Sequence, residues 1–233
     1  MKSQKVTNER QGGSKRRYDD ACGTAHGLEL IGERWALLVM RELMLGPKRF
    51  SDLKADLPGI SANVLTQRLE GLEESGLLVR KRLPPPANAQ VYELTEWGYE
   101  AEPIVQTLGR WAARSPAHDP TLPISATSIM LSFRTMYDPQ RARGFAAKVG
   151  FRFGNESFLA WAESGELKTV RGDADTADAI FVGQPAALAG AVYGKAPLDD
   201  LARAGLLRAE GNADVVRRFI DMFELPPKAQ LPA

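Results

Sequence analysis

Two amide side chains, Asn63 and Gln67, are the residues whose spacing best suits the recognition of another molecule. They lie four positions apart, so a helix that begins at Ser61 places them on the same face. Each amide offers a hydrogen-bond donor and an acceptor together, which is the pattern presented by a base edge in the major groove of double-stranded DNA. An uncharged, hydrogen-bonding face of this kind predicts base contacts.

The helix that carries these amides is expected over residues 61–75. Its buried stripe is formed by three leucines at helical spacing: Leu65, Leu69 and Leu72. Ser61 is a favoured N-cap residue, and Gly76 suits the left-handed position after the last turn. Its second half carries three acids that repel phosphate: Glu70, Glu73 and Glu74. Only the N-terminal half is therefore expected to enter a groove.

A basic hairpin is expected directly after this helix. Residues 77–83 and 90–94 form its two strands, and a proline-rich turn joins them. Arg80, Lys81 and Arg82 fall in a stretch without an acid between residues 75 and 92, which suits contact with phosphates. The alternative is that the helix has the polar face of any surface helix and that the charge run is a solvated face.

Three further helical segments are predicted upstream, separated by Gly-Pro and Pro-Gly turn signals. Their expected apolar core consists of Leu28, Ile31, Trp35, Leu38, Val39, Leu43, Phe50, Leu53 and Leu57. The segment 50–57, the turn at 58–61 and the helix from Ser61 form a helix-turn-helix pair. With the hairpin added, the unit is a winged helix.

In this arrangement residues 21–115 resemble the HxlR family of bacterial transcription regulators, which is related to the MarR group. The matching residues are Cys22, Leu30, Ile31, Gly32, Trp35, Leu43, Gly46, Pro47, Arg49, Phe50, Ser51, Leu53, Pro58, Gly59, Ile60, Ser61, Leu65, Thr66, Leu69, Leu72, Gly76, Leu77, Tyr92, Leu94 and Thr95. The resemblance implies a homodimer that binds palindromic DNA, with the recognition helix at 61–75 and the wing at about 80–94. Family members repress or activate. The expected DNA contacts are Arg49, Ser51, Lys54, Ser61, Asn63, Thr66, Gln67, Arg68, Arg80, Lys81, Arg82 and Asn88.

A dimerisation surface is expected on the helix that follows the wing. Thr95 can cap a helix over residues 96–114, and Pro103 bends or restarts it. Three apolar residues repeat beyond the proline at helical spacing: Ile104, Leu108 and Trp111. They either join two subunits or close the helical core of one.

Cys22 is the one cysteine, so the chain has no internal disulfide. HxlR-type proteins often carry an N-terminal cysteine at this place, and the resemblance implies a thiol that in some of them senses oxidants or electrophiles. Arg16 and Arg17 lie nearby in sequence and could lower the pKa of this thiol. The alternative is a small buried residue. Neither histidine, His26 nor His118, has neighbours at metal-ligand spacing, and no nucleophile–base pattern or phosphate loop occurs. No metal, cofactor or enzymatic activity is expected.

Charge and length divide the chain into four expected parts. Residues 1–20, a flexible arm, hold six basic and three acidic residues, whereas the whole chain has a net charge of +1. A winged-helix domain at 21–115, a linker at 116–124 and a second domain at 125–228 follow. Because the chain is not a polycation, DNA affinity must come from local basic clusters. No apolar stretch approaches 18 residues, so a cytoplasmic protein without a membrane partner is expected.

The second half predicts an antiparallel sheet packed by helices, which makes the whole chain α+β. Strands are expected at 128–137, 148–153, 156–163 and 167–170, and residues 177–223 follow as strand, helix, short helix, strand and final helix. This half resembles the sterol-carrier-protein fold through Ala177, Asp178, Ala179, Phe181, Val182, Leu188, Tyr193, Gly194, Leu198, Ala204, Gly205, Leu207, Glu210, Gly211 and residues 215–223. The resemblance implies an α/β domain that holds apolar ligands in an internal tunnel.

The residues expected to line such a pocket are Leu131, Phe133, Phe151, Phe153, Phe158, Trp161, Phe181, Leu188, Val192 and Tyr193. The combined hypothesis is a DNA-binding regulator that an apolar small molecule or lipid modulates. In one alternative, these residues are ordinary core and the second half only supports dimerisation, with sensing left to Cys22. In another, the chain is a lipid-binding protein whose winged helix binds protein.

Overall fold

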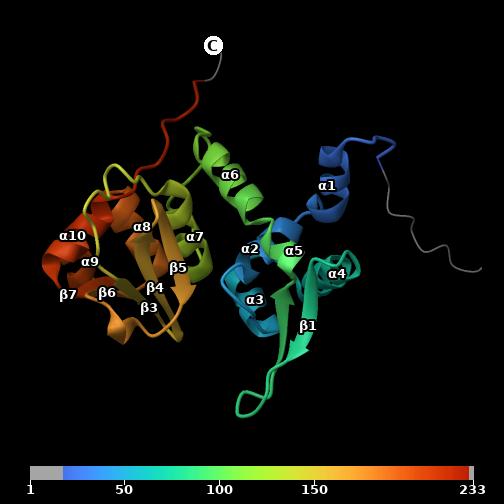
Figure 1. Ribbon diagram of the computed structural model, residues 1–233, viewed down its shortest axis with the longest axis horizontal. Helices are drawn as coiled ribbons and strands as arrows, with labels where there is room; N and C mark the ends of the chain where they lie inside the picture. Colours follow the sequence, from blue (N-terminus) through green and yellow to red (C-terminus); the bar gives the residue numbers. More distant parts are fainter. Residues whose placement is uncertain (1–17, 231–233) are drawn as a thin grey trace, which may run out of the picture.

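The first half of the chain forms a helical bundle with a projecting hairpin, as the computed structural model, which describes residues 18–230, shows (Figure 1). Its elements are α1 (Gly23–Ile31), α2 (Ala36–Leu43), α3 (Phe50–Asp56), α4 (Ala62–Glu74), β1 (Leu78–Arg82), β2 (Gln90–Leu94), α5 (Glu96–Tyr99) and α6 (Glu102–Ala113). The α4 bounds agree with the prediction, because the Ser61 Oγ accepts the Val64 N–H at 3.2 Å and Gly76 has a φ of +73°. Most of the predicted arm lies outside the described residues.

The core of this half differs in part from the predicted set of residues. Its buried side chains come mainly from α2, from α3 and the turn after it, from α4 and from the hairpin, and include Val39, Leu43, Leu53, Leu57, Leu65, Leu69, Leu72, Leu78 and Leu94. Leu28 and Leu38 were wrongly assigned to it, since they are 49% and 38% exposed. Ala25 is the buried residue of α1, which packs little of its surface against the bundle, and Leu38 faces a cleft described below.

The helix predicted over residues 96–114 is two helices. Thr95 caps the first, because its Oγ1 accepts the Gly98 N–H at 3.0 Å. α6 restarts with Pro103 in its first turn, where the missing proline N–H breaks no helical hydrogen bond. Ile104, Leu108 and Trp111 are 52%, 45% and 70% exposed, so the expectation that they close the helical core is wrong.

The second half is a five-stranded sheet with helices. Its elements are α7 (Ala126–Met136), β3 (Val149–Phe153), β4 (Glu156–Glu163), β5 (Glu166–Arg171), the 3₁₀ turn η1 (Ala174–Thr176), β6 (Ala179–Gly183), α8 (Pro185–Tyr193), α9 (Leu198–Arg203), β7 (Leu207–Gly211) and α10 (Ala213–Asp221). The strand order is β5-β4-β3-β6-β7. The order of elements from β6 to α10 agrees with the prediction.

Two expectations for this half are wrong. The strand predicted at 128–137 is the helix α7, which Ser125 caps by accepting the Ser128 N–H at 3.0 Å. Most residues of α7 are buried, and a helix that is apolar on nearly every side loses the 3.6-residue pattern that would identify it. The sheet is also mixed, because β3 pairs with β6 in parallel after the β4–β5 hairpin.

α7 packs between the two halves, against α2 and α6 on one side and against β5 and α8 on the other (Figure 1). The buried apolar residues of both halves consequently form one continuous cluster. Beyond α7, aromatic rings fill the second half. The Phe133 and Phe223 ring centroids are 4.6 Å apart, and those of Phe151 and Phe181 are 5.8 Å apart. Residues 115–125, which include the predicted linker, contain no helix or strand.

Candidate nucleic-acid interface

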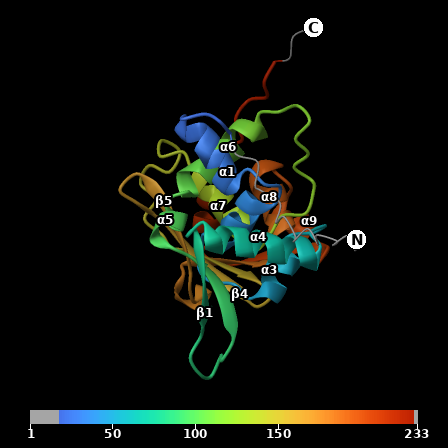
Figure 2. The same ribbon diagram turned by 90° about the vertical axis from the view of Figure 1, so that its right-hand side faces the viewer.

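The N-terminal half of α4 presents an uncharged polar face to solvent. Ser61, Asn63, Thr66 and Gln67 are all exposed, while the leucine stripe on the opposite side anchors the helix in the bundle. The turn before α4 needs a left-handed residue, which Gly59 supplies with a φ of +90°. In Figure 2, α4 crosses the front of the molecule above the projecting hairpin. Within the part of the chain that the structure describes, the amides are therefore accessible to groups outside the protein.

The hairpin is fixed to the bundle at its base. β1 and β2 pair in antiparallel register from Leu78 opposite Leu94 to Arg82 opposite Gln90. At the base, the backbone of Lys48 exchanges two hydrogen bonds with that of Tyr92, at 2.9 and 3.1 Å. This bridge joins the segment between α2 and α3 to the hairpin. These backbone hydrogen bonds of Lys48 help to hold the hairpin, which we call the wing, against the bundle.

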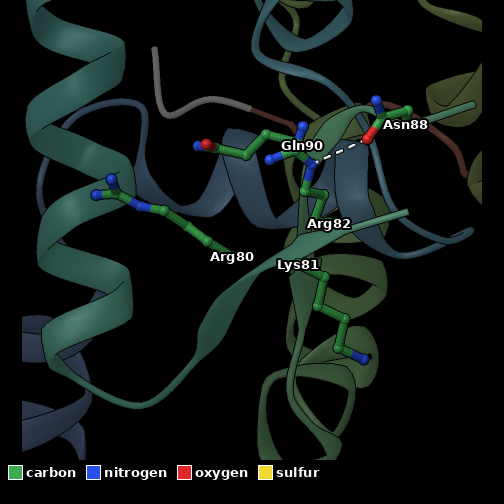
Figure 3. A pocket seen from close by; sticks show the side chains of 5 residues that line it. All are labelled: Arg80, Lys81, Arg82, Asn88 and Gln90. Carbon is green, nitrogen blue, oxygen red and sulfur yellow. Dashed lines mark hydrogen bonds between the residues drawn. The ribbon is translucent and has the colours of Figure 1, made fainter. Parts of the chain in front are cut away.

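The sequence around the basic residues of the wing contains no acid between residues 75 and 92. In the structure, each of these basic residues nevertheless has a partner. Arg80 lies 2.9 Å from a Glu73 oxygen, and Lys81 lies 2.6 Å from a Glu93 oxygen. The Arg82 Nε instead donates to the Asn88 amide oxygen at 3.0 Å, across a hollow of about 420 Å³ (Figure 3). Glu93 lies diagonally across the strands from Lys81, so strand register would have indicated this pair. Glu73 is brought to Arg80 only by packing of α4 against β1.

Four other predicted DNA-contact residues differ in how far they are exposed to solvent. Arg49 and Ser51 are exposed at the start of α3, and Lys54 is half-buried in the same helix. Arg68 turns toward Glu33, with 3.2 Å between the guanidinium and the carboxylate, and its side chain is mostly buried. The structure thus gathers the α4 amides and the wing cations, whereas Arg68 is engaged within the protein.

Cys22 is exposed at the start of α1, so the expectation of a small buried residue is wrong. The backbone N–H of Thr24, its side chain and the N–H of Ala25 lower the pKa of this thiol, since they stabilise the thiolate. Arg16 and Arg17, which were expected to act on it, lie outside the described residues.

The expected pocket residues of the second half mostly lie in its packed core. Those that are buried are Leu131, Phe133, Phe151, Phe153, Phe158, Phe181, Leu188 and Val192. Trp161 is half-buried, and the Tyr193 hydroxyl lies 2.7 Å from the Ser132 Oγ. Burial raises the pKa of Tyr193, so it remains a neutral phenol. Contact of any of these side chains with a ligand stays a prediction.

Across residues 18–230, no three His, Cys, Asp or Glu side chains are arranged to hold a metal ion. Within the same range, no helix is long and apolar enough to cross a membrane.

Comparison with known proteins places the first half of the chain in a family. Residues 30–119 match the family described as HxlR-like helix-turn-helix. The chain is 43% identical over 94 residues to the uncharacterized HTH-type transcriptional regulator YkvN of Bacillus subtilis (strain 168), covering 39% of this chain and 77% of that protein. It is 37% identical over 83 residues to the HTH-type transcriptional regulator YodB of the same organism, covering 36% and 74%. The solved reduced form of YodB is 33% identical, covers 42% of this chain and 98% of that chain, and gives a TM-score of 0.38. The chain belongs to the HxlR-like helix-turn-helix family of transcriptional regulators.

Proposed function

We propose that this regulator binds palindromic double-stranded DNA as a homodimer, with α4 as its recognition helix. The observation that carries the proposal is the exposed amide face of α4 beside an exposed basic wing. Ser61, Asn63, Thr66 and Gln67 are assigned to base edges in the major groove. The assigned phosphate contacts come from α3 and the wing: Arg49, Ser51, Lys54, Arg80, Lys81, Arg82 and Asn88.

Selection of bound duplexes from a random pool tests this proposal. The expected product is an inverted repeat whose half-sites lie about 34 Å apart, one turn of the duplex, because a twofold dimer presents two copies of α4. Recovery of duplexes without a shared sequence would contradict specific reading by α4.

Arg82 is expected to contribute a phosphate contact that depends strongly on salt. Its guanidinium is held by an uncharged amide, whereas Arg80 and Lys81 each lie beside a carboxylate. Arg82→Ala should weaken binding to all duplexes and reduce the slope of log K against log salt by about 1. Fluorescence anisotropy at several salt concentrations measures the slope, and Arg203→Ala, an exposed arginine of α9, is the control. An unchanged slope would remove Arg82 from the interface.

We propose that the exposed stripe of Ile104, Leu108 and Trp111 on α6 forms the dimer interface. These side chains form an apolar surface on one face of α6, and burying it between two subunits is favourable. Trp111→Asp should convert the dimer to a monomer in sedimentation velocity. The matched control is Gly109→Asp, which adds the same charge to a different face of α6 where a Cβ meets no atom within 4 Å. Equal masses for both variants would place the interface elsewhere.

We assign residues 21–115 to DNA binding and dimerisation, and residues 125–228 to the response to an apolar effector. The five-stranded sheet with α8 and α10, together with the resemblance to sterol-carrier proteins, supports the second assignment. The effector can change the affinity for DNA only by as much as its own affinities for the DNA-competent and the DNA-incompetent states differ.

A second candidate function is sensing of oxidants or electrophiles through Cys22. The exposed thiol at a helix start, with its lowered pKa, favours it. Treatment with diamide should then lower the DNA affinity of the wild-type protein and leave that of Cys22→Ser unchanged. Equal responses of the two proteins would exclude this function.

A further inference from the structure

A cleft of about 690 Å³ opens between the two halves of the chain. One wall comes from α2 and from the turn between α3 and α4, and the other from the β3–β4 turn and the start of α8. The segment before α7 forms part of the lining. This volume falls within the range of small-molecule sites, which is about 300–1,000 Å³.

The apolar part of the lining includes Leu38, which is exposed although it is an apolar residue. Leu38 projects from α2 toward the cleft, where Trp35 and Pro58 flank it on the first half. Phe153 and Pro185 face it from the second half. These side chains suit the apolar body of a ligand, because its surface would leave water on binding.

The polar part of the lining includes two carboxylates. Asp56 and Glu156 line the cleft with side chains that are 21% and 22% exposed. Arg41 also lines it, but its Nε and Nη2 donate to the buried Glu42 at 3.0 and 2.8 Å. The Asp56 Oδ1 and Glu156 Oε2 accept no hydrogen bond from residues 18–230. A cationic donor would complement this pair of carboxylates.

The cations behind the cleft are already shared among acids. The Lys48 ammonium is 2.9 Å from Glu42, 2.6 Å from Asp56 and 3.8 Å from Glu156. Arg171 lies 2.7 Å from Glu156. Burial, together with the Glu42 and Glu156 carboxylates, raises the pKa of Asp56 despite its bond to Lys48. Lys48 thus divides its charge among three carboxylates, and it is the one cation within ion-pair distance of Asp56 among residues 18–230.

We infer that this cleft is a binding site for an apolar organic cation, such as an aromatic molecule with a protonated amine. The regulatory part of this inference rests on the proposed function. The inference places the effector at the boundary between the halves and not in the interior of the second half. The amine lies against Asp56 and Glu156, and the apolar body lies along Leu38, Pro58 and Phe153.

The same residues connect the cleft to both DNA-reading elements. Asp56 ends α3, and Pro58 lies in the turn that leads to α4. Lys48, which shares the Asp56 carboxylate, is bonded through its backbone to Tyr92 at the base of the wing. A cation that draws Asp56 away from Lys48 thus acts on the placement of α4 and the wing together. Coupling of this kind typically changes affinity by about 5- to 150-fold.

Calorimetry on the full chain without DNA tests the site itself. The probes are 2-naphthylmethylammonium, the neutral 2-naphthylmethanol and the anionic 2-naphthylacetate, which share one apolar body. We expect the ammonium to bind at least about tenfold more tightly than the alcohol, and the acetate to bind most weakly. Equal affinities, or the tightest binding by the acetate, would overturn the inference.

Variants locate the binding. Gln184→Trp should fill the cleft and weaken binding of the ammonium at least tenfold, whereas Ala186→Trp, an exposed α8 residue outside the lining, should not. Asp56→Asn keeps an oxygen for Lys48 and should bring the affinities of ammonium and alcohol together. Urea unfolding confirms that each variant is folded. Unchanged affinity in Gln184→Trp, or an unchanged ammonium preference in Asp56→Asn, would overturn the placement.

DNA binding separates this inference from the proposed function. With the selected duplex, saturating ammonium should change the affinity of the wild-type protein at least fivefold and leave that of Gln184→Trp unchanged. Cleft binding without any change in DNA affinity would overturn the regulatory part. Failure of the ligand-free protein to bind DNA would overturn the proposed function and leave the calorimetric result standing.

Discussion

Replacing both Asn63 and Gln67 with alanine is expected to lower affinity for the selected duplex by roughly two to four orders of magnitude. Each amide can make a bidentate pair with a base edge, and losing such a pair costs about 1–3 kcal/mol of discrimination. Both side chains are exposed on the N-terminal half of α4, so their removal leaves no cavity in the core. Fluorescence anisotropy with the selected duplex measures the loss.

Two controls separate base reading from general weakening. The affinity of the double variant for a scrambled duplex should stay near that of the wild-type protein, because the wing and α3 cations are intact. Gln140→Ala removes an exposed amide from the second half and should change neither affinity. Equal losses on the selected and scrambled duplexes would show that α4 does not read sequence.

Replacing Glu42 with alanine is expected to destabilise the fold by about 3–5 kcal/mol, which is typical when one partner of a buried ion pair is removed. Glu42 is fully buried, and it accepts from Arg41, Lys48 and Ser125. The substitution leaves Lys48, which is 3% exposed, with less compensation for its charge. Urea unfolding measures the free energy. Asp200→Ala breaks an exposed pair with Arg203 and should cost little.

The same network sets the pH range of stability. Burial by itself raises the pKa of Glu42, but the charges of Arg41 and Lys48 outweigh it and hold the pKa below its ordinary value of 4.5. The stabilisation from Glu42 is therefore complete above about pH 4.5 and is lost as the pH falls through the lower, folded value. Burial by itself lowers the pKa of Lys48, but Glu42 and Asp56 outweigh burial and raise this pKa above its ordinary value of 10.5. The stabilisation from Lys48 is therefore lost only as the pH rises through the pKa of the folded state.

Glu42→Ala should consequently show a shallower loss of unfolding free energy below pH 4.5 than the wild-type protein does. Parallel pH profiles for the two proteins would mean that Glu42 is not part of this acid dependence. The same experiment also tests the contribution of Lys48 to stability at alkaline pH. Without Glu42, the stabilising shift of Lys48 is smaller, so the variant should lose stability at a lower alkaline pH.

Local patterns in the sequence determined the winged helix. The leucine spacing from Leu65 to Leu72, the Ser61 cap and the Gly76 terminus define α4, because each depends on residues within a few turns of one another. The same holds for β3, β4 and β5, whose alternation and bounding glycines predicted three neighbouring strands. The assigned base, phosphate and dimer contacts remain predictions.

Tertiary packing decided what the sequence could not. α7 is buried on most sides, so its helical period is hidden, and β6 pairs in parallel only because the chain crosses back to β3. Glu156 comes from the second half of the chain, whereas Glu42 and Lys48 come from the first, so the contact between Lys48 and Glu156 and the cleft beside it exist only when the halves pack together. Helix periods and caps are local properties, whereas burial and the pairing of charges depend on neighbours far away in the sequence.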